Sequence, residues 1–257
     1  MSKLLSLTYG FVAYLVFLGV FVYFIGFVGD IGTPTSLDGD ALGSIASALL
    51  IDIALLALFS LQHSVMARRG FKERWTRLVP EHLERSTYLL AASAALALLM
   101  WAWRPIPITV WHVTHAGIAG LLWLGFAVGW VIVLSSTFLI DHFRLFGLKQ
   151  VWHFARDQVE APPAFETPAL YRLVRHPLYL GFIVAFWFTP RMTVGHLLFA
   201  SVWTGWIVFA IGLEEKDLVH EHGEAYRRYR EAVRMLLPWP KGRPRGSVVS
   251  PVGRYRA

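Results

Sequence analysis

The sequence predicts an all-α protein that crosses a membrane several times as a polytopic helix bundle. Three observations lead to this prediction. Hydrophobic residues make up 56% of the 257 residues, charged residues only 16%, and the mean hydropathy is +0.50, whereas a soluble domain averages about a quarter charged residues. The apolar residues are gathered into long stretches. The Lys and Arg residues fall almost entirely between alternate stretches, so an ordinary soluble enzyme is excluded.

Six apolar stretches are separated by polar segments. They cover residues 4–28, 41–62, 87–103, 113–140, 178–189 and 193–213. Crossing the apolar core of a bilayer takes about 20 helical residues, so four or five of the six are long enough. The first is longer than the apolar core of a signal peptide and ends without a small-x-small cleavage site, so we expect it to be retained as a helix.

The fifth stretch is too short to cross unless its helix begins earlier. Thr167 and Pro168 offer an N-cap and a first-turn proline for such a start, and Pro177 would then kink the helix. The alternative is a hairpin arm that dips in and out around Pro190 and Arg191. Either way the chain ends in a C-terminal helical hairpin, followed by a cytoplasmic cofactor-binding tail.

Positive charge is distributed very unevenly between the two sides of the predicted spans. The alternating connections carry 22 Lys and Arg residues on one side and 2 on the other. Cytoplasmic loops carry such an excess, so we expect both termini in the cytoplasm and the protein in a bacterial inner membrane. The net charge of +7 then reflects topology and anionic lipid. The lipid bilayer is an expected partner, nucleic acid is not, and no obligatory protein partner is implied.

Polar chemistry is confined to the cytoplasmic connections. We expect one integral-membrane domain over residues 1–240, with a cofactor half at about 170–240, and a loose tail over 241–257. The absence of cysteine excludes a cysteine-ligated zinc or iron–sulfur site. The run from His220 to His222 is a single short motif, whereas membrane di-iron enzymes need several, so we expect no metal.

The strongest polar motif lies where the cytoplasm meets the fifth stretch. Arg175 and His176 precede Pro177, which disfavours helical geometry at His176. Tyr179 follows on the next turn, and Gly181 permits a close backbone approach.

The last stretch ends in Glu214 and Glu215, which the hairpin returns to the same border. We therefore expect Arg175, His176 and Tyr179 to face the two glutamates across one pocket, or else to form a plain salt bridge with them. Arginine suits a carboxylate, glutamate an amine or vicinal hydroxyls, and an aromatic face a cation. S-adenosylmethionine carries all of these groups.

A second polar segment follows the fourth stretch directly. Asp141 and His142 lie where a long helix leaves the bilayer. That position places a possible base at the wall of an apolar cavity within reach of the cytoplasm. A plain helix end with interfacial charges is the alternative.

Taken in order, these motifs resemble a known family. The run from Arg175 to Gly181, the Glu214-Glu215 pair and the run from Gly223 to Tyr229 resemble the integral-membrane methyltransferases of the isoprenylcysteine carboxyl methyltransferase type. The rest of the chain is similar to a narrower branch, the methanethiol S-methyltransferases, through residues 24–29, 62–67 and, most distinctively, 139–152. Nitric-oxide-reductase accessory proteins share some of these features.

The resemblance implies methyl transfer from S-adenosylmethionine to a nucleophile that arrives from the membrane. In the narrower branch the acceptor is a small thiol, methanethiol, and the product is dimethyl sulfide. The alternatives are methylation of a prenylcysteine carboxylate or another lipid-soluble acceptor, and a non-enzymatic membrane accessory protein. Two departures from the family pattern stand out: Arg234 replaces an expected proline, and Asp141 replaces an expected asparagine.

The resemblance also implies roles for individual residues. His142 is the expected catalytic base, with Asp141 or His63 as its partner. The substrate is expected to contact His63, Phe143 and Trp152. The cofactor is expected to contact Arg175, His176, Tyr179, Gly181, Glu214, Glu215 and Tyr226.

Overall fold

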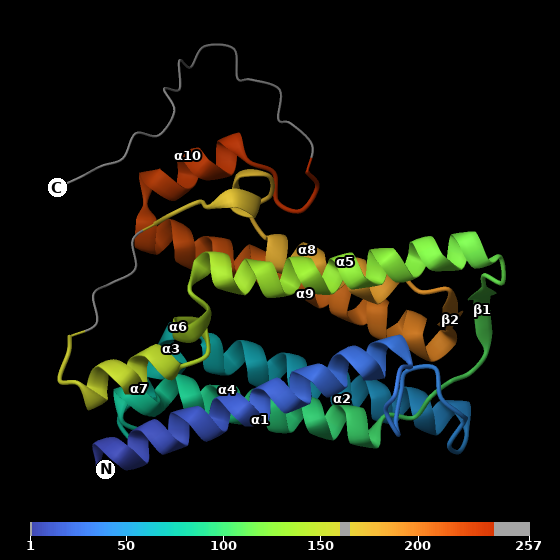
Figure 1. The fold of residues 1–257 in the computed structure, drawn as a ribbon, viewed down its shortest axis with the longest axis horizontal. Helices are drawn as coiled ribbons and strands as arrows, with labels where there is room; N and C mark the ends of the chain where they lie inside the picture. The colour runs from blue at the N-terminus through green and yellow to red at the C-terminus, as the bar shows by residue number, and fades with distance from the viewer. Residues whose placement is uncertain (1, 160–164, 239–257) are drawn as a thin grey trace.

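A computed structural model describes residues 2–159 and 165–238, and the predicted tail 241–257 lies outside them. Helices dominate, and one pair of short strands joins two connections (Figure 1). The elements are α1 (Lys3–Gly29), α2 (Ile45–Ala67), α3 (Arg69–Trp75), α4 (Glu81–Ala102), β1 (Thr109–His112), α5 (Ala116–Ile140), α6 (His142–Leu145), α7 (Leu148–Ala155), the 3₁₀ helix η1 (Ala169–Arg172), α8 (Pro177–Trp187), β2 (Arg191–Thr193), α9 (Val194–His222) and α10 (Glu224–Ala232).

Three of the long helices begin at a hydroxyl side chain. The hydroxyl groups of Ser2, Ser44 and Thr193 accept hydrogen bonds from the backbone N–H three residues further on, at the starts of α1, α2 and α9. Such caps satisfy amide groups that the helix itself leaves without a partner. The long apolar runs thus begin at defined residues.

The long helices form two layers. In Figure 1, α1, α2 and α4 lie on one side and α5, α8 and α9 on the other, with their axes along the long direction of the molecule. A buried aromatic cluster joins the layers: Phe24 of α1 contacts Trp130 of α5, Phe186 of α8 and Trp203 of α9, at ring-centroid distances of 5.5 to 6.1 Å. Aromatic pairs at this spacing add to the energy of burial itself.

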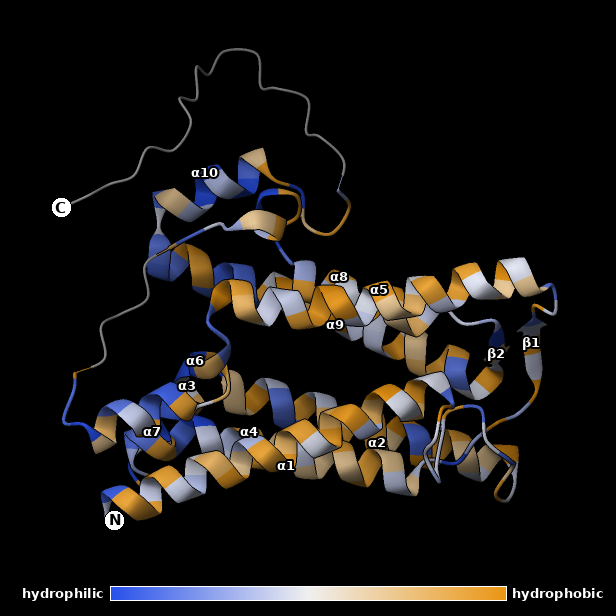
Figure 2. Cartoon of the chain, in the orientation of Figure 1, coloured by the Kyte–Doolittle hydropathy of each residue, from blue (hydrophilic) through white to orange (hydrophobic). Residues whose placement is uncertain are grey.

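The outside of the bundle is apolar. In the described part of the chain, five helices are long and apolar enough to cross a membrane: α1, α2, α4, α5 and α9. Large apolar side chains such as Leu50 and Trp101 are about three-quarters exposed, and Figure 2 shows hydrophobic residues along the helices and hydrophilic ones at their ends. A surface of this kind needs lipid around it. The chain is an integral membrane protein, and the predicted all-α polytopic bundle is confirmed.

The short helix α8 corrects one expectation. The helix begins at Pro177, its first residue, instead of at Thr167, so Pro177 starts the helix and does not kink it. The turn at Pro190 and Arg191 lies at the far end of the bundle, where β2 pairs antiparallel with β1 (Figure 1). The fifth segment therefore traverses the bundle as a short helix plus an extended piece.

The bundle has two distinct ends. The strand end holds residues 30–44, 103–115 and 188–193. The helical end holds the start of α1 and the elements α3, α6, α7, η1 and α10 (Figure 1). The described parts of the basic connections that are predicted to share one side of the membrane lie at the helical end (Figure 1).

Candidate active site

The backbone just before α8 is fixed to the segment that follows α10. The N–H groups of Arg175 and His176 donate to the carbonyl groups of Arg234 and Met235, at 2.8 and 3.1 Å. Pro177 keeps the preceding residue out of helical geometry, so these two N–H groups are available for pairing. The pairing brings α10 against the start of α8.

The predicted convergence of the basic and acidic motifs is present. Arg175 Nε donates to Glu215 Oε1 at 2.7 Å, and His176 Nε2 lies 3.1 Å from the same oxygen. Tyr179 donates to Glu214 Oε2 at 2.9 Å. We call these five residues the acid–base cluster. Its role in binding a cofactor stays a prediction.

Arg175 differs from the expectation in one respect. Its Nη1 donates to the carbonyl groups of Arg230, at 3.1 Å, and Val233, at 2.5 Å, while Nε and Nη2 hold Glu215. All three guanidinium nitrogens thus have partners inside the protein, and the residue is buried. Arg175 therefore secures the end of α10 to α9, and its role in cofactor binding stays a prediction.

Tyrosines surround the cluster. Tyr226 of α10 is buried, and its hydroxyl group has no hydrogen-bond partner within the described residues. Burial first, and then the neighbouring Glu215 carboxylate, raise the pKa of Tyr226 above its usual range. Burial and Glu214 act in the same direction on the pKa of Tyr171. Both phenols therefore stay protonated and are hydrogen-bond donors at neutral pH.

An aromatic wall adjoins these tyrosines. The ring of Phe165 lies 5.8 Å from that of Tyr226 and 5.6 Å from that of Tyr229. Neither Phe165 nor Tyr171 stands in a recognisable sequence motif. The sequence does indicate an aromatic face on this helix, because the three-residue spacing of Tyr226 and Tyr229 places two rings on one side of it.

Gly181 packs α8 closely against α5, and its contact with a cofactor stays a prediction. A Cβ atom at this position would lie 2.7 Å from the carbonyl oxygen of Gly129 and 2.8 Å from the backbone nitrogen of Val133. The glycines allow the backbones of α5 and α8 to touch. The close approach predicted for Gly181 is real, but its partner is another helix.

His142 has both ring nitrogens engaged. Nδ1 lies 2.9 Å from Thr137 Oγ1, and Nε2 lies 2.8 Å from Tyr14 Oη. The Thr137 hydroxyl donates its one proton to the carbonyl group of Leu134, so Nδ1 is the donor and Nε2 accepts from Tyr14. Burial lowers the pKa of His142, which agrees with this neutral ring. His142 thus ties α1 to the end of α5.

Asp141 is not the partner of His142, contrary to expectation. Its carboxylate accepts from Lys149 Nζ at 2.6 Å and from the backbone N–H of Arg144 at 3.2 Å, which caps α6. Burial alone would raise the pKa of Asp141, but these two hydrogen bonds and the positive charge of Lys149 hold it below its usual range. The carboxylate is therefore ionised and bound to its own segment.

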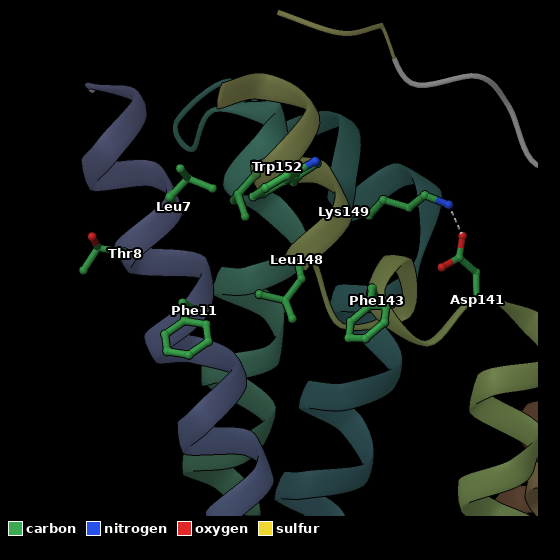
Figure 3. A pocket seen from close by; sticks show the side chains of 9 residues that line it. Leu7, Thr8, Phe11, Asp141, Phe143, Leu148, Lys149 and Trp152 are labelled. Carbon is green, nitrogen blue, oxygen red and sulfur yellow. Dashed lines mark hydrogen bonds and ion pairs between the residues drawn. The ribbon is translucent and has the colours of Figure 1, made fainter. Parts of the chain in front are cut away.

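Phe143 and Trp152 line a separate groove. This apolar groove, about 650 Å³ in volume, lies between α1 and the α6–α7 segment and includes Leu7, Phe11 and Leu148 (Figure 3). Phe143 and Trp152 are each about half exposed. The groove shares no lining residue with the acid–base cluster, so the structure does not bring these two predicted substrate residues to the predicted cofactor residues.

His63, by contrast, lies near the cluster. Tyr88 Oη of α4 is 3.0 Å from His63 Nδ1, and five residues after His63 the Arg68 side chain pairs with Asp217, three residues beyond Glu214, at 2.8 Å. No sequence pattern links His63 to Tyr88, because the contact depends on how α2 packs against α4. Of the residues predicted to contact substrate, His63 is the one that the fold places beside the cluster.

Comparison with known proteins identifies the family. The chain is 53% identical over 239 residues to methanethiol S-methyltransferase of Crocosphaera subtropica, with 93% of this chain and 94% of the relative covered. The corresponding protein of Mycobacterium tuberculosis is 51% identical, with 93% and 98% covered. Human nurim is a more distant relative, 31% identical, with 72% and 73% covered. No family model and no solved structure matches the chain. The chain belongs to the methanethiol S-methyltransferase family and is a methyltransferase.

Proposed function

We propose that this protein transfers a methyl group from S-adenosylmethionine to methanethiol, giving dimethyl sulfide. The observation that carries the proposal is similarity over nearly the whole chain to relatives named for this reaction. The acid–base cluster supports the choice of methyl donor, because its chemistry matches the polar groups of that molecule.

Several side chains around the acid–base cluster support S-adenosylmethionine as the methyl donor. Within the described residues Glu214 has one partner, Tyr179, so its carboxylate has capacity for an ammonium group or ribose hydroxyls. The Tyr226 hydroxyl, buried without a partner, is a donor suited to a carboxylate. The rings of Phe165 and Tyr229 offer faces for stacking an adenine or for the sulfonium charge. Glu215 is bound to Arg175 and His176, so we assign it the role of positioning these two side chains.

When bound, S-adenosylmethionine supplies an electrophilic methyl carbon attached to a positive sulfur. The protein's part is to hold this carbon in line with the acceptor sulfur, which replaces a bimolecular encounter with a fixed geometry. The thiol must lose its proton, because the thiolate is the nucleophile. An apolar bundle also keeps water away from the reacting charges.

We also propose that both termini are cytoplasmic, in a bacterial inner membrane. The 22-to-2 division of Lys and Arg supports this orientation. Single cysteines in this cysteine-free chain provide the test. Ala41→Cys at the strand end should react with an impermeant reagent on intact cells, and Glu73→Cys at the helical end should not. Both positions are exposed, so the opposite labelling pattern would reverse the orientation.

The activity test uses purified protein with S-adenosylmethionine and a panel of acceptors: methanethiol, ethanethiol and a farnesylated cysteine. Dimethyl sulfide in the headspace is the expected product. If only the farnesylated cysteine is methylated, the acceptor is a prenylcysteine carboxylate and not a small thiol. Failure to bind S-adenosylhomocysteine in calorimetry would overturn the proposed donor.

A further inference from the structure

The proposed reaction requires a group that takes the thiol proton. Such a base needs a ring or carboxylate lone pair that is not already engaged, and it must lie within reach of the acceptor. His142 does not meet the first requirement, since its Nε2 accepts from Tyr14 and its Nδ1 donates to Thr137. Asp141 is held by Lys149 and by the cap of α6.

His63 meets this requirement. The hydroxyl of Tyr88 lies 3.0 Å from Nδ1 and 3.1 Å from Nε2. The Tyr88 hydroxyl directs its one proton toward the carbonyl oxygen of His63 at 3.4 Å, so toward the ring it accepts from the nitrogen that carries N–H. Within the described residues the ring has no other hydrogen-bond partner. The second ring nitrogen of His63 therefore keeps an uncommitted lone pair.

The surroundings of His63 combine access with an apolar wall. Its side chain is exposed, although its ring is stacked on Phe59 at 5.3 Å and tilted against Tyr88 at the same distance. Phe59 in turn stacks on Trp203 of α9 at 5.1 Å. The imidazole thus lies at the accessible end of a column of aromatic rings that leads into the bundle, which suits a small apolar thiol.

The depth of His63 follows from the packing of α2 beside α9. Both helices run from the strand end to the helical end (Figure 1), and Phe59 is level with Trp203. His63 is four residues beyond Phe59, and Glu214 is eleven residues beyond Trp203. At about 1.5 Å per helical residue, His63 lies about 10 Å deeper in the bundle than Glu214. An acceptor arriving from the apolar side reaches His63 before it reaches the acid–base cluster.

We infer that His63 is the catalytic base of the methyl transfer and that Tyr88 is a positioning residue that orients its ring. This inference rests on the proposed function. The uncommitted nitrogen takes the proton from the thiol S–H. The sulfur electron pair then forms the new C–S bond, while the electrons of the breaking C–S bond stay on the donor sulfur, which becomes a neutral thioether. The imidazolium releases its proton to cytoplasmic water, so charge and atoms balance.

A pair of acceptors tests this role directly. Methaneselenol is much more acidic than methanethiol and is already ionised at neutral pH, so it needs no base. In His63→Gln we expect turnover on methanethiol to fall about 10²- to 10⁴-fold, with recovery at alkaline pH, while turnover on methaneselenol changes less than about threefold. Tyr88→Phe should also lower turnover on methanethiol, by a smaller factor, and should leave turnover on methaneselenol nearly unchanged.

His220→Gln is the matched control. This histidine is exposed near the helical end of α9, so its substitution should leave both activities unchanged. Binding of S-adenosylhomocysteine by the His63 variant should equal that of the unaltered protein, which establishes that the cofactor cluster is intact. Equal losses on thiol and selenol, or full activity on methanethiol, would overturn the role of His63 while leaving the proposed function in place. Unaltered protein that methylates no thiol would instead overturn the proposed function.

Discussion

At each end of the helix bundle a buried histidine meets a carboxylate, and the two pairs differ in what surrounds them. At the strand end, His196 Nδ1 lies 2.7 Å from Asp38 Oδ2, and its Nε2 lies 3.0 Å from the carbonyl oxygen of Phe186. The other oxygen of Asp38 accepts from the backbone N–H of Thr193. Each of these polar atoms has a partner, and the group, which we call the structural lock, joins the 30–44 connection to α8, β2 and α9.

At the helical end, His176 and Glu215 are equally buried, but the groups beside them are not fully paired. The Tyr226 hydroxyl has no partner in the described part of the chain, and the half-buried Glu214 carboxylate has one. Buried polar groups are nearly always satisfied, so a cluster with unsatisfied donors and acceptors indicates a place for a ligand. The comparison teaches that saturation of the hydrogen-bonding groups, more than burial or charge, separates the structural lock from the proposed binding site.

The largest expected effect comes from breaking the lock. Asp38→Ala leaves the buried His196 without its partner, and breaking such a pair costs about 3–5 kcal/mol. We expect the free energy of unfolding in detergent to fall by about that amount, while the affinity of the remaining folded protein for S-adenosylhomocysteine is unchanged. The neighbouring exposed residue gives the control, Asp40→Ala, which should have little effect. Loss of affinity at unchanged stability would instead mean that Asp38 and His196 take part in ligand binding.

Next in size is the effect of Glu214→Gln. A hydrogen bond to a charged group is worth about 1.5–3 kcal/mol, so S-adenosylhomocysteine should bind at least about tenfold more weakly in calorimetry. Stability should change little, because the variant still accepts a hydrogen bond from Tyr179. Glu221→Gln, at an exposed position on the same helix, should bind normally. Unchanged affinity in the Glu214 variant would remove this carboxylate from the site.

Tyr226→Phe should separate binding from stability more sharply. The variant loses a donor that has no partner in the described structure, so we expect unchanged or slightly higher thermal stability. Affinity should fall about fivefold, the equivalent of one ordinary hydrogen bond of about 1 kcal/mol. A drop in stability of similar size, with binding unaffected, would mean that the hydroxyl is satisfied within the protein.

The smallest effect concerns Asp141 and depends on pH. The pKa of Asp141 is lowered in the folded protein, mainly by Lys149 against the opposing effect of burial. Its stabilising contribution is therefore present above the unfolded pKa of about 3.9 and is lost as pH falls through the lower folded value. Asp141→Asn keeps the helix cap but loses the ion pair. Because this pair is partly exposed, we expect a loss of less than about 1 kcal/mol at pH 7 that shrinks as the pH falls below the unfolded pKa. A loss that grows toward acid pH would contradict the assigned sign.

The sequence predicted the bundle well because long apolar stretches and alternating charge are properties of single segments. The sequence also predicted that Arg175, His176 and Tyr179 meet Glu214 and Glu215, because the hairpin returns both motifs to one border of the membrane. It did not predict that the carbonyl groups of Arg230 and Val233 occupy the Arg175 guanidinium, because the direction of a backbone carbonyl appears only in the folded chain.

The packing partners of two other sites could not be predicted, for related reasons. Asp141 and His142 are adjacent in sequence, yet the first caps α6 and the second points back toward Tyr14 and Thr137. The partner of Gly181 is Gly129, more than fifty residues earlier, and that contact depends on how two helices are set against each other. Pairing between distant helices is not encoded in local motifs.

The contact between Gly129 and Gly181 has a mechanical consequence. With backbone against backbone and no side chain between them, α5 and α8 form one closely packed unit. The start of α8 at Pro177, next to Arg175 and His176, lies at the same end of this unit as Ile140, where α5 ends and the Asp141–Phe143 rim of the groove begins (Figure 1). The glycine contact therefore fixes the spacing between the acid–base cluster and that rim, and a bulkier residue at position 129 or 181 would force the two helices apart.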